Sequence, residues 1–260
     1  MVSSGRKVLY FFTLLIIPFL LWIIPQTKIH FITFLLILLL YIVSRYWKEI
    51  SFLHDGLEII LLYLTLSFLL NEIGLDNLFP ANVLIIIILL YLFLFRLKKW
   101  DRARLFLIRG NIKKTLGIVI LFSMLSIVSL VIWFIFQKEN AYAKFIPELP
   151  IPILLPLGIG FGIINGFYEE GLSRSILLSH FTEQIGFKGA MLLQSFWFSF
   201  LHYQSGFPSG IIGIGLTFVF GLMMGYLVYR TKGLLVPIVI HVLADFTIFI
   251  LVILRIHNMI

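Results

Sequence analysis

Ionisable side chains interrupt the apolar runs in the second half of the chain at three places, and the first holds Glu169, Glu170 and Arg174. These residues continue the apolar run 151–167. On a helix, Glu170 and Arg174 lie four residues apart and can form an ion pair, while Glu169 projects about 100° away around the helix axis. One carboxylate is then neutralised locally, and its neighbour is left to act as a base. The alternative is that all three side chains lie at a helix end and are solvated there.

The other two places carry histidine. His202 ends a dense aromatic run, and His241 precedes Asp245 by four residues within the apolar run 233–254. His241 and Asp245 therefore project from one face of a helix. A lone histidine at a helix end is ordinarily interfacial or hydrogen-bonded, and a His–Asp pair can simply hold two helices together. Asp245 is harder to explain in that way, because it is the only Asp or Glu after Glu183.

Together, the three places indicate one chemistry. A charge inside a bilayer costs roughly 2.5–3.5 kcal/mol on insertion scales, so three apolar helices that each carry carboxylate or imidazole need a common reason. Gathering these groups in one cavity removes the cost of exposing each to lipid. Glutamate and histidine can take a proton from water, and a second histidine beside an aspartate can stabilise an oxyanion or help to hold a metal. Attack of water on an amide needs that combination.

The elements that must position these residues are membrane-spanning helices. Of the 260 residues, 61% are hydrophobic and only 12% are charged, which lies far outside the composition of water-soluble domains. No strand-like alternation is present, so the sequence predicts an all-α, polytopic transmembrane helical bundle of about eight or nine spans. The third span is short enough to be tilted or incomplete. The expected spans are 8–24, 30–46, 57–70, 82–97, 115–136, 151–179, 188–203, 209–229 and 233–254.

Polarity divides the chain near residue 150. Before that point, charges lie at the ends of spans that are rich in Leu, Ile and Phe; after it, they lie within or next to apolar runs, beside glycines four residues apart such as Gly158 and Gly162. Small residues at this spacing let membrane helices approach closely. We therefore assign 1–149 to transmembrane scaffold helices and 150–260 to a catalytic transmembrane core.

The net charge of +8 comes from basic residues between the spans, which favours a role in topology and lipid contact over nucleic-acid binding. The segment 96–114 holds eight Lys or Arg against one acid, whereas 71–81 holds two acids and no base. This asymmetry predicts a cytoplasmic N-terminus and a cytoplasmic 96–114 segment. The first apolar run lacks a small-residue cleavage site, so we interpret it as a retained helix rather than a signal peptide.

Three motifs carry a resemblance to a known family: Glu169-Glu170-x-x-x-Arg174, Phe198-x-x-x-His202 and His241-x-x-x-Asp245. In this order, and on apolar helices, they resemble the motifs of the CPBP intramembrane proteases. That family includes the CaaX prenyl-protein endopeptidases and bacteriocin-processing or abortive-infection proteins. The resemblance covers about residues 150–250, and the preceding part adds only helices.

The resemblance implies a role for each residue. Glu169 would activate water with His202 as its partner, while His241 and Asp245 would polarise the carbonyl. In the prenyl-protein enzymes the last position is typically asparagine, so the role of Asp245 stays open. The family has been described both as metalloproteases and as metal-independent glutamate proteases; a divalent metal such as zinc, if present, would be held by Glu169, His202 and His241. The resemblance also implies a cavity that opens toward the cytoplasmic face.

Two other classes of function stay open. A polar membrane core can bind a cation or proton in a transporter, although no repeat symmetry of that kind is visible. The chain could also be a non-catalytic bacteriocin-immunity protein that keeps the motif residues. For the protease, the expected partners are the lipid bilayer and a membrane-associated, prenylated or leader-peptide substrate, and the expected location is the bacterial cytoplasmic membrane. The remaining histidines are expected at the membrane interface: His30, His54, His180 and His257.

Overall fold

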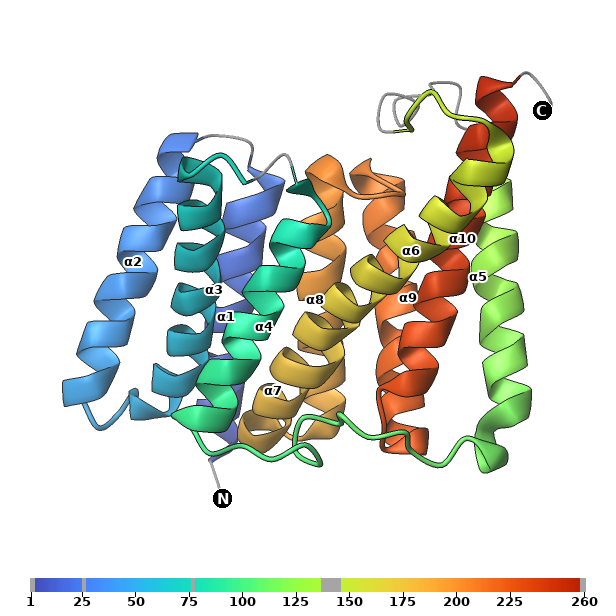
Figure 1. Ribbon diagram of the computed structural model, residues 1–260. Helices are drawn as coiled ribbons and strands as arrows, with labels where there is room; N and C mark the ends of the chain where they lie inside the picture. The colour runs from blue at the N-terminus through green and yellow to red at the C-terminus, as the bar shows by residue number, and fades with distance from the viewer. Residues whose placement is uncertain (1–2, 25–26, 76–77, 137–145, 258–260) are drawn as a thin grey trace.

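The computed structural model describes residues 3–24, 27–75, 78–136 and 146–257. In these residues helices are joined by short loops, and none forms a strand (Figure 1). The predicted all-α class is therefore confirmed. Seven of the described helices are long and apolar enough to cross a membrane, and one further apolar helix is shorter. The chain is an integral, multi-pass membrane protein.

The first half supplies five helical spans. They are α1 (Ser4–Pro18) with its π-helical continuation η1 (Phe19–Ile23), α2 (Thr27–Tyr46), α3 (His54–Glu72), α4 (Ala81–Arg96) and α5 (Leu116–Phe136). Single 3-10 turns precede two of them: η2 (Ser51–Leu53) before α3 and η4 (Lys113–Thr115) before α5. The third span, expected to be tilted or incomplete, has 22 residues when its leading turn is included, and that is long enough to cross.

The second half supplies four spans. The first is continuous from residue 151 to 185 and consists of α6 (Ile151–Glu170), the π-helical segment η6 (Gly171–Leu177) and α7 (Leu178–Ile185). It crosses the middle of the bundle at a steep tilt (Figure 1). The other three are α8 (Phe187–Ser205), α9 (Gly210–Thr231) and α10 (Leu235–Ile256). With α6 to α7 counted as one, the described residues form nine helical elements, seven of them long and apolar enough to cross a membrane, which is consistent with the bundle of about eight or nine spans that the sequence predicted.

Close packing of α6 against α10 depends on glycine. A Cβ atom on Gly158 would lie 2.5 Å from the ring of Phe249, and one on Gly162 would lie 3.3 Å from the Val242 carbonyl oxygen and 3.4 Å from Asp245 Cβ. A side chain on Gly158 would require the ring of Phe249 to move, and one on Gly162 would press against the backbone of α10. The glycine spacing noted in the sequence therefore brings the backbone of α10, and the polar residues on it, directly against α6.

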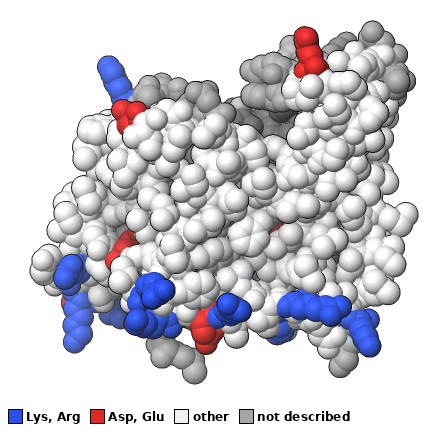
Figure 2. Space-filling view, in the orientation of Figure 1, with Lys and Arg blue, Asp and Glu red and all other residues white. Residues whose placement is uncertain are grey.

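Basic residues gather at one end of the bundle, the lower end in Figure 2. The N-terminus, the loop between α4 and α5 and the turn between α9 and α10 all lie there (Figure 1), so that end carries the basic segments 6–7, 45–48, 96–113 and 230–232. We call it the basic end, and the opposite end the far end. Among the described basic residues, Lys28 on α2 and Arg255 on α10 lie at the far end.

The loop between α4 and α5 packs against η6 and α7. Ser175 Oγ donates to the Leu105 carbonyl oxygen at 2.5 Å, and Ser179 Oγ donates to the Arg104 carbonyl oxygen at 2.8 Å. Trp100 from the same loop stacks on His180, with ring centroids 6.0 Å apart. His180 is thus buried and not interfacial, contrary to the expectation from the sequence, because this loop covers the end of the helix that carries it.

Candidate active site

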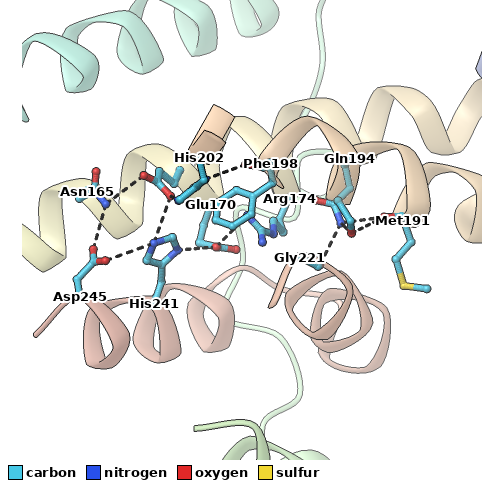
Figure 3. Close-up of polar contacts among 12 residues, drawn as sticks. Asn165, Glu170, Arg174, Met191, Gln194, Phe198, His202, Gly221, His241 and Asp245 are labelled. Atoms are coloured by element: carbon cyan, nitrogen blue, oxygen red, sulfur yellow. Dashed lines mark hydrogen bonds and ion pairs between the residues drawn. The ribbon is translucent and has the colours of Figure 1, made fainter. Parts of the chain in front are cut away.

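The close contact of α6 with α10 brings the first and third motifs together (Figure 3). His241 Nδ1 hydrogen-bonds to Glu170 Oε1 at 2.7 Å. On the other side of the ring, His241 Nε2 lies 3.3 Å from Glu169 Oε2 and 3.7 Å from Asp245 Oδ1. Since a carboxylate only accepts, the proton on Nδ1 belongs to the bond with Glu170, and Nε2 faces two further carboxyl groups. One imidazole therefore links three acidic side chains.

Helix α8 carries the second motif and approaches the site on the side of η6. His202 Nε2 lies 3.7 Å from Glu169 Oε2, and His202 Nδ1 donates to the Phe198 carbonyl oxygen at 2.8 Å. Because the carbonyl fixes the hydrogen on Nδ1, a neutral His202 directs the lone pair of Nε2 toward Glu169. The structure thus brings Glu169, His202, His241 and Asp245 together at one place.

Glu170 and Arg174 form the expected ion pair. Arg174 Nη1 lies 3.2 Å from Glu170 Oε1, and both side chains are fully buried. The guanidinium also lies over the ring of Phe198, 4.1 Å from its centroid, which partly replaces lost hydration by a cation–π contact. The helix that carries Arg174 is π-helical from residue 171, not α-helical as the sequence argument assumed, yet the pair still forms. Segments of this type are rare and are often found at functional sites.

Asn165 is a member of the site that the sequence analysis missed. Its Nδ2 donates to Glu169 Oε1 at 3.2 Å and to Asp245 Oδ2 at 3.1 Å, and its side chain is buried. The amide therefore holds the carboxyl groups of two helices apart at a fixed distance. The signal in the sequence was a lone amide, four residues before Glu169, in an otherwise apolar run.

A cavity of about 280 Å³ reaches Glu169 and His202. Its wall combines residues of both halves of the chain, so helices assigned to the scaffold also shape the site. The lining residues are Trp22, Tyr63, Phe79, Val83, Tyr168, Glu169, Leu172, Ser173, Phe198, Leu201, His202 and Gly206.

Three hydroxyl groups in this wall were not expected from the sequence. The hydroxyl groups of Tyr63 and Tyr168 are hydrogen-bonded to each other at 2.9 Å. Ser173 Oγ is buried and finds no hydrogen-bond partner among the residues that the structure describes. A buried hydroxyl without a protein partner is costly, and here it adjoins a cavity in which another molecule could bind it.

The sequence predicted that the cavity opens toward the basic end, but the lining residues indicate the far end. Trp22 lies at the end of η1, Val83 in the first turn of α4 and Gly206 just beyond α8, and all three positions are at the far end (Figure 1). The physical reason is the place of His202, which lies in the last turn of α8 and so meets Glu169 from the far end.

The expected metal ligands were Glu169, His202 and His241. In the described part of the chain, no three His, Asp or Glu side chains are arranged so that they could hold a metal ion. His241 already directs both ring nitrogens at carboxyl groups. The residues as placed do not fit a metal ion.

Comparison with protein-family models matches part of the chain. Residues 151–247 match the family model described as type II CAAX prenyl endopeptidase, Rce1-like. No curated protein and no solved structure matches the chain. The matched residues hold all three motifs, and the match agrees with the family resemblance of the sequence. The segment 151–247 is therefore similar to the Rce1-like type II CAAX prenyl endopeptidases, and this similarity supports a membrane protease at the level of the family.

Proposed function

We propose that the chain is an intramembrane endopeptidase that hydrolyses a peptide bond with a water molecule activated by Glu169 and His202. One observation carries the proposal: Glu169 Oε2 and His202 Nε2 lie 3.7 Å apart at the wall of one cavity. That separation is too long for a direct hydrogen bond, and we propose that a water molecule bridges the two atoms. A water beside both atoms would donate one hydrogen to the carboxylate and the other to the imidazole.

In the proposed reaction, the oxygen of this water attacks the carbonyl carbon of the peptide as Glu169 takes one proton. A C–O bond forms and the carbonyl becomes a tetrahedral oxyanion. The proton then passes from Glu169 to the amide nitrogen as the C–N bond breaks. The products are a carboxylic acid and an amine, and Glu169 returns to its starting form. Asn165, bonded to the other oxygen of Glu169, keeps the carboxylate oriented during both transfers.

We propose that His241 stabilises the oxyanion. Nε2 of its ring faces the carboxyl groups of Glu169 and Asp245, so a proton must sit on that nitrogen or on one of the carboxyl groups to prevent repulsion. A protonated Nε2 would donate to the oxyanion as negative charge develops there. Glu170 accepts from Nδ1 and so fixes the ring, and Arg174 compensates the charge of Glu170.

We also propose that the substrate is a membrane-associated peptide, because the cavity wall is mostly aromatic and aliphatic. Neither alternative function is favoured by a specific observation in the described part of the chain.

The test is a cleavage assay of the purified protein on membrane-associated peptides, with Glu169→Gln beside the wild type. We expect Glu169→Gln to abolish turnover with little change in thermal unfolding, because the amide keeps the shape of the carboxylate but cannot accept the proton. The matched control is Glu183→Gln, which alters an acid paired with Arg104 at the surface and should cleave normally. Wild-type turnover by Glu169→Gln would refute the proposal, and a chelator arm of the same assay tests metal dependence.

A further inference from the structure

The cavity opens toward one end of the bundle, and the side on which it opens specifies the class of substrate that can reach it. We infer that the site is reached only from the far end of the bundle, which faces away from the cytoplasm. The substrate would then be the extended, apolar segment of a membrane-anchored peptide on the extracytoplasmic side. The statement about the substrate rests on the proposed peptidase function, whereas the statement about access does not.

Several residues that line the cavity lie at the far end. Trp22 belongs to the last turn of the first span, Phe79 lies two residues before α4, and Gly206 directly follows α8. Each of these positions lies where its helix begins or ends at the far end (Figure 1). Glu169 and His202 line the same cavity. None of its lining residues comes from the loops of the basic end within the described part of the chain.

The basic end is closed beneath the site. Arg174 and Phe181 have no exposed surface, so the helix that continues from Glu169 toward that end is enclosed by protein. The loop between α4 and α5 then covers η6 and α7, held by the two serine hydroxyls that donate to its carbonyl oxygens. Trp100 and Leu105 of this loop are buried against the bundle. A peptide that came from the basic end would have to displace this packed layer.

The charge distribution indicates which side of the membrane each end of the bundle faces. Lys and Arg gather at the basic end (Figure 2), including the dense segment 96–113. Loops rich in Lys and Arg stay in the cytoplasm, since their charge disfavours translocation. The basic end is therefore cytoplasmic, and the mouth of the cavity opens on the other side. This arrangement reverses the direction of access that the sequence led us to expect.

The cavity wall specifies the chemistry of the segment that fits. Among the described residues that line it, aromatic rings dominate, Glu169 supplies the single carboxylate, and there is no Lys or Arg. A volume of about 280 Å³ is close to the lower limit of ligand pockets, roughly 300 Å³, so it admits a short extended stretch and no folded domain. The backbone of such a stretch needs hydrogen-bond partners, and Ser173 Oγ and the paired hydroxyls of Tyr63 and Tyr168 can supply them.

Access can be measured without catalysis, because the chain contains no cysteine. Single substitutions Phe79→Cys at the mouth and Leu201→Cys inside the cavity are compared with Arg102→Cys in the basic loop. Ile163→Cys on the lipid-facing surface of α6 is the control for a thiol in hydrocarbon, where the reactive thiolate does not form. A charged, membrane-impermeant thiol reagent is applied to intact cells and, separately, to inverted membrane vesicles.

We expect Phe79→Cys and Leu201→Cys to react in intact cells, Arg102→Cys only in inverted vesicles, and Ile163→Cys in neither. Reaction of Leu201→Cys only from the side on which Arg102→Cys reacts would overturn the inference. Failure of Leu201→Cys to react from either side, while Phe79→Cys reacts, would overturn it as well, since the cavity would then be closed to water.

The substrate class is tested in proteoliposomes with two reporter peptides of one sequence, anchored so that the scissile segment lies on the far side or on the basic side. We expect cleavage of the far-side reporter alone, and none of it by Glu169→Gln. Cleavage of the basic-side reporter alone would overturn the inference but support the peptidase function. If neither reporter is cut, the peptidase function fails for this substrate class and the inferred substrate falls with it, while the labelling result still decides the direction of access.

Discussion

The buried pair of Glu170 and Arg174 offers a quantitative test of how the site is held together. Both side chains are fully buried, and 3.2 Å separates their charged atoms. Arg174→Met keeps much of the volume of the side chain but leaves the carboxylate of Glu170 without its counter-charge. Removing one partner of a buried ion pair costs about 3–5 kcal/mol, because the remaining charge is neither hydrated nor compensated. Loss of the cation–π contact with Phe198 moves the expected value toward the upper part of that range.

The matched control is the exposed pair of Arg104 and Glu183, whose side chains are 33% and 43% exposed. Arg104→Met removes an exposed ion pair and a cation–π contact with Trp100, which together stabilise by no more than about 1–2 kcal/mol. The free energy of unfolding is measured by denaturant titration of the purified protein in detergent micelles. We expect Arg174→Met to be clearly the less stable of the two variants.

A second substitution separates charge from volume. Glu170→Gln added to Arg174→Met removes the unpaired carboxylate but keeps a side-chain oxygen that can accept from His241 Nδ1. The double variant should therefore be more stable than Arg174→Met alone. The reasoning is refuted if Arg174→Met unfolds at the same denaturant concentration as Arg104→Met, or if the second substitution lowers stability further.

Two further predictions concern residues that position the site. Asn165→Ala should lower turnover strongly with a much smaller effect on substrate affinity, because Glu169 loses the amide that orients it; unchanged kcat in the cleavage assay would contradict this. Gly162→Ile should reduce both activity and stability, by roughly 1–3 kcal/mol for the latter, because even its Cβ atom would meet the Val242 carbonyl oxygen at 3.3 Å. Gly160→Ile is its control, since a Cβ atom there meets nothing within 4 Å.

The sequence by itself determined the all-α fold class and placed the three polar motifs on apolar helices. Hydropathy decides which segments can leave water, so long apolar runs are read directly from composition. The ion pair of Glu170 with Arg174 and the shared face of His241 and Asp245 follow from spacing within one helix. The glycines at helical spacing likewise indicated a close helix contact, although not which helix would fill it.

Only the tertiary structure decided which of these residues contact one another across helices. That Asn165 bridges Glu169 to Asp245, and that Glu170 serves His241 as well as Arg174, depends on which face of α6 meets α10. No local pattern encodes that rotation, because it results from the packing of all the neighbouring helices.

The sequence also could not predict the end of the bundle at which the cavity opens. It depends on two features of packing: the loop between α4 and α5 folds back over α7, and His202 meets Glu169 from the far end of α8. Charge patterning could identify the side on which that loop lies, since translocation responds to the number of basic residues in a loop. It could not indicate that the same loop, by burying Trp100 and Leu105, closes the site on that side.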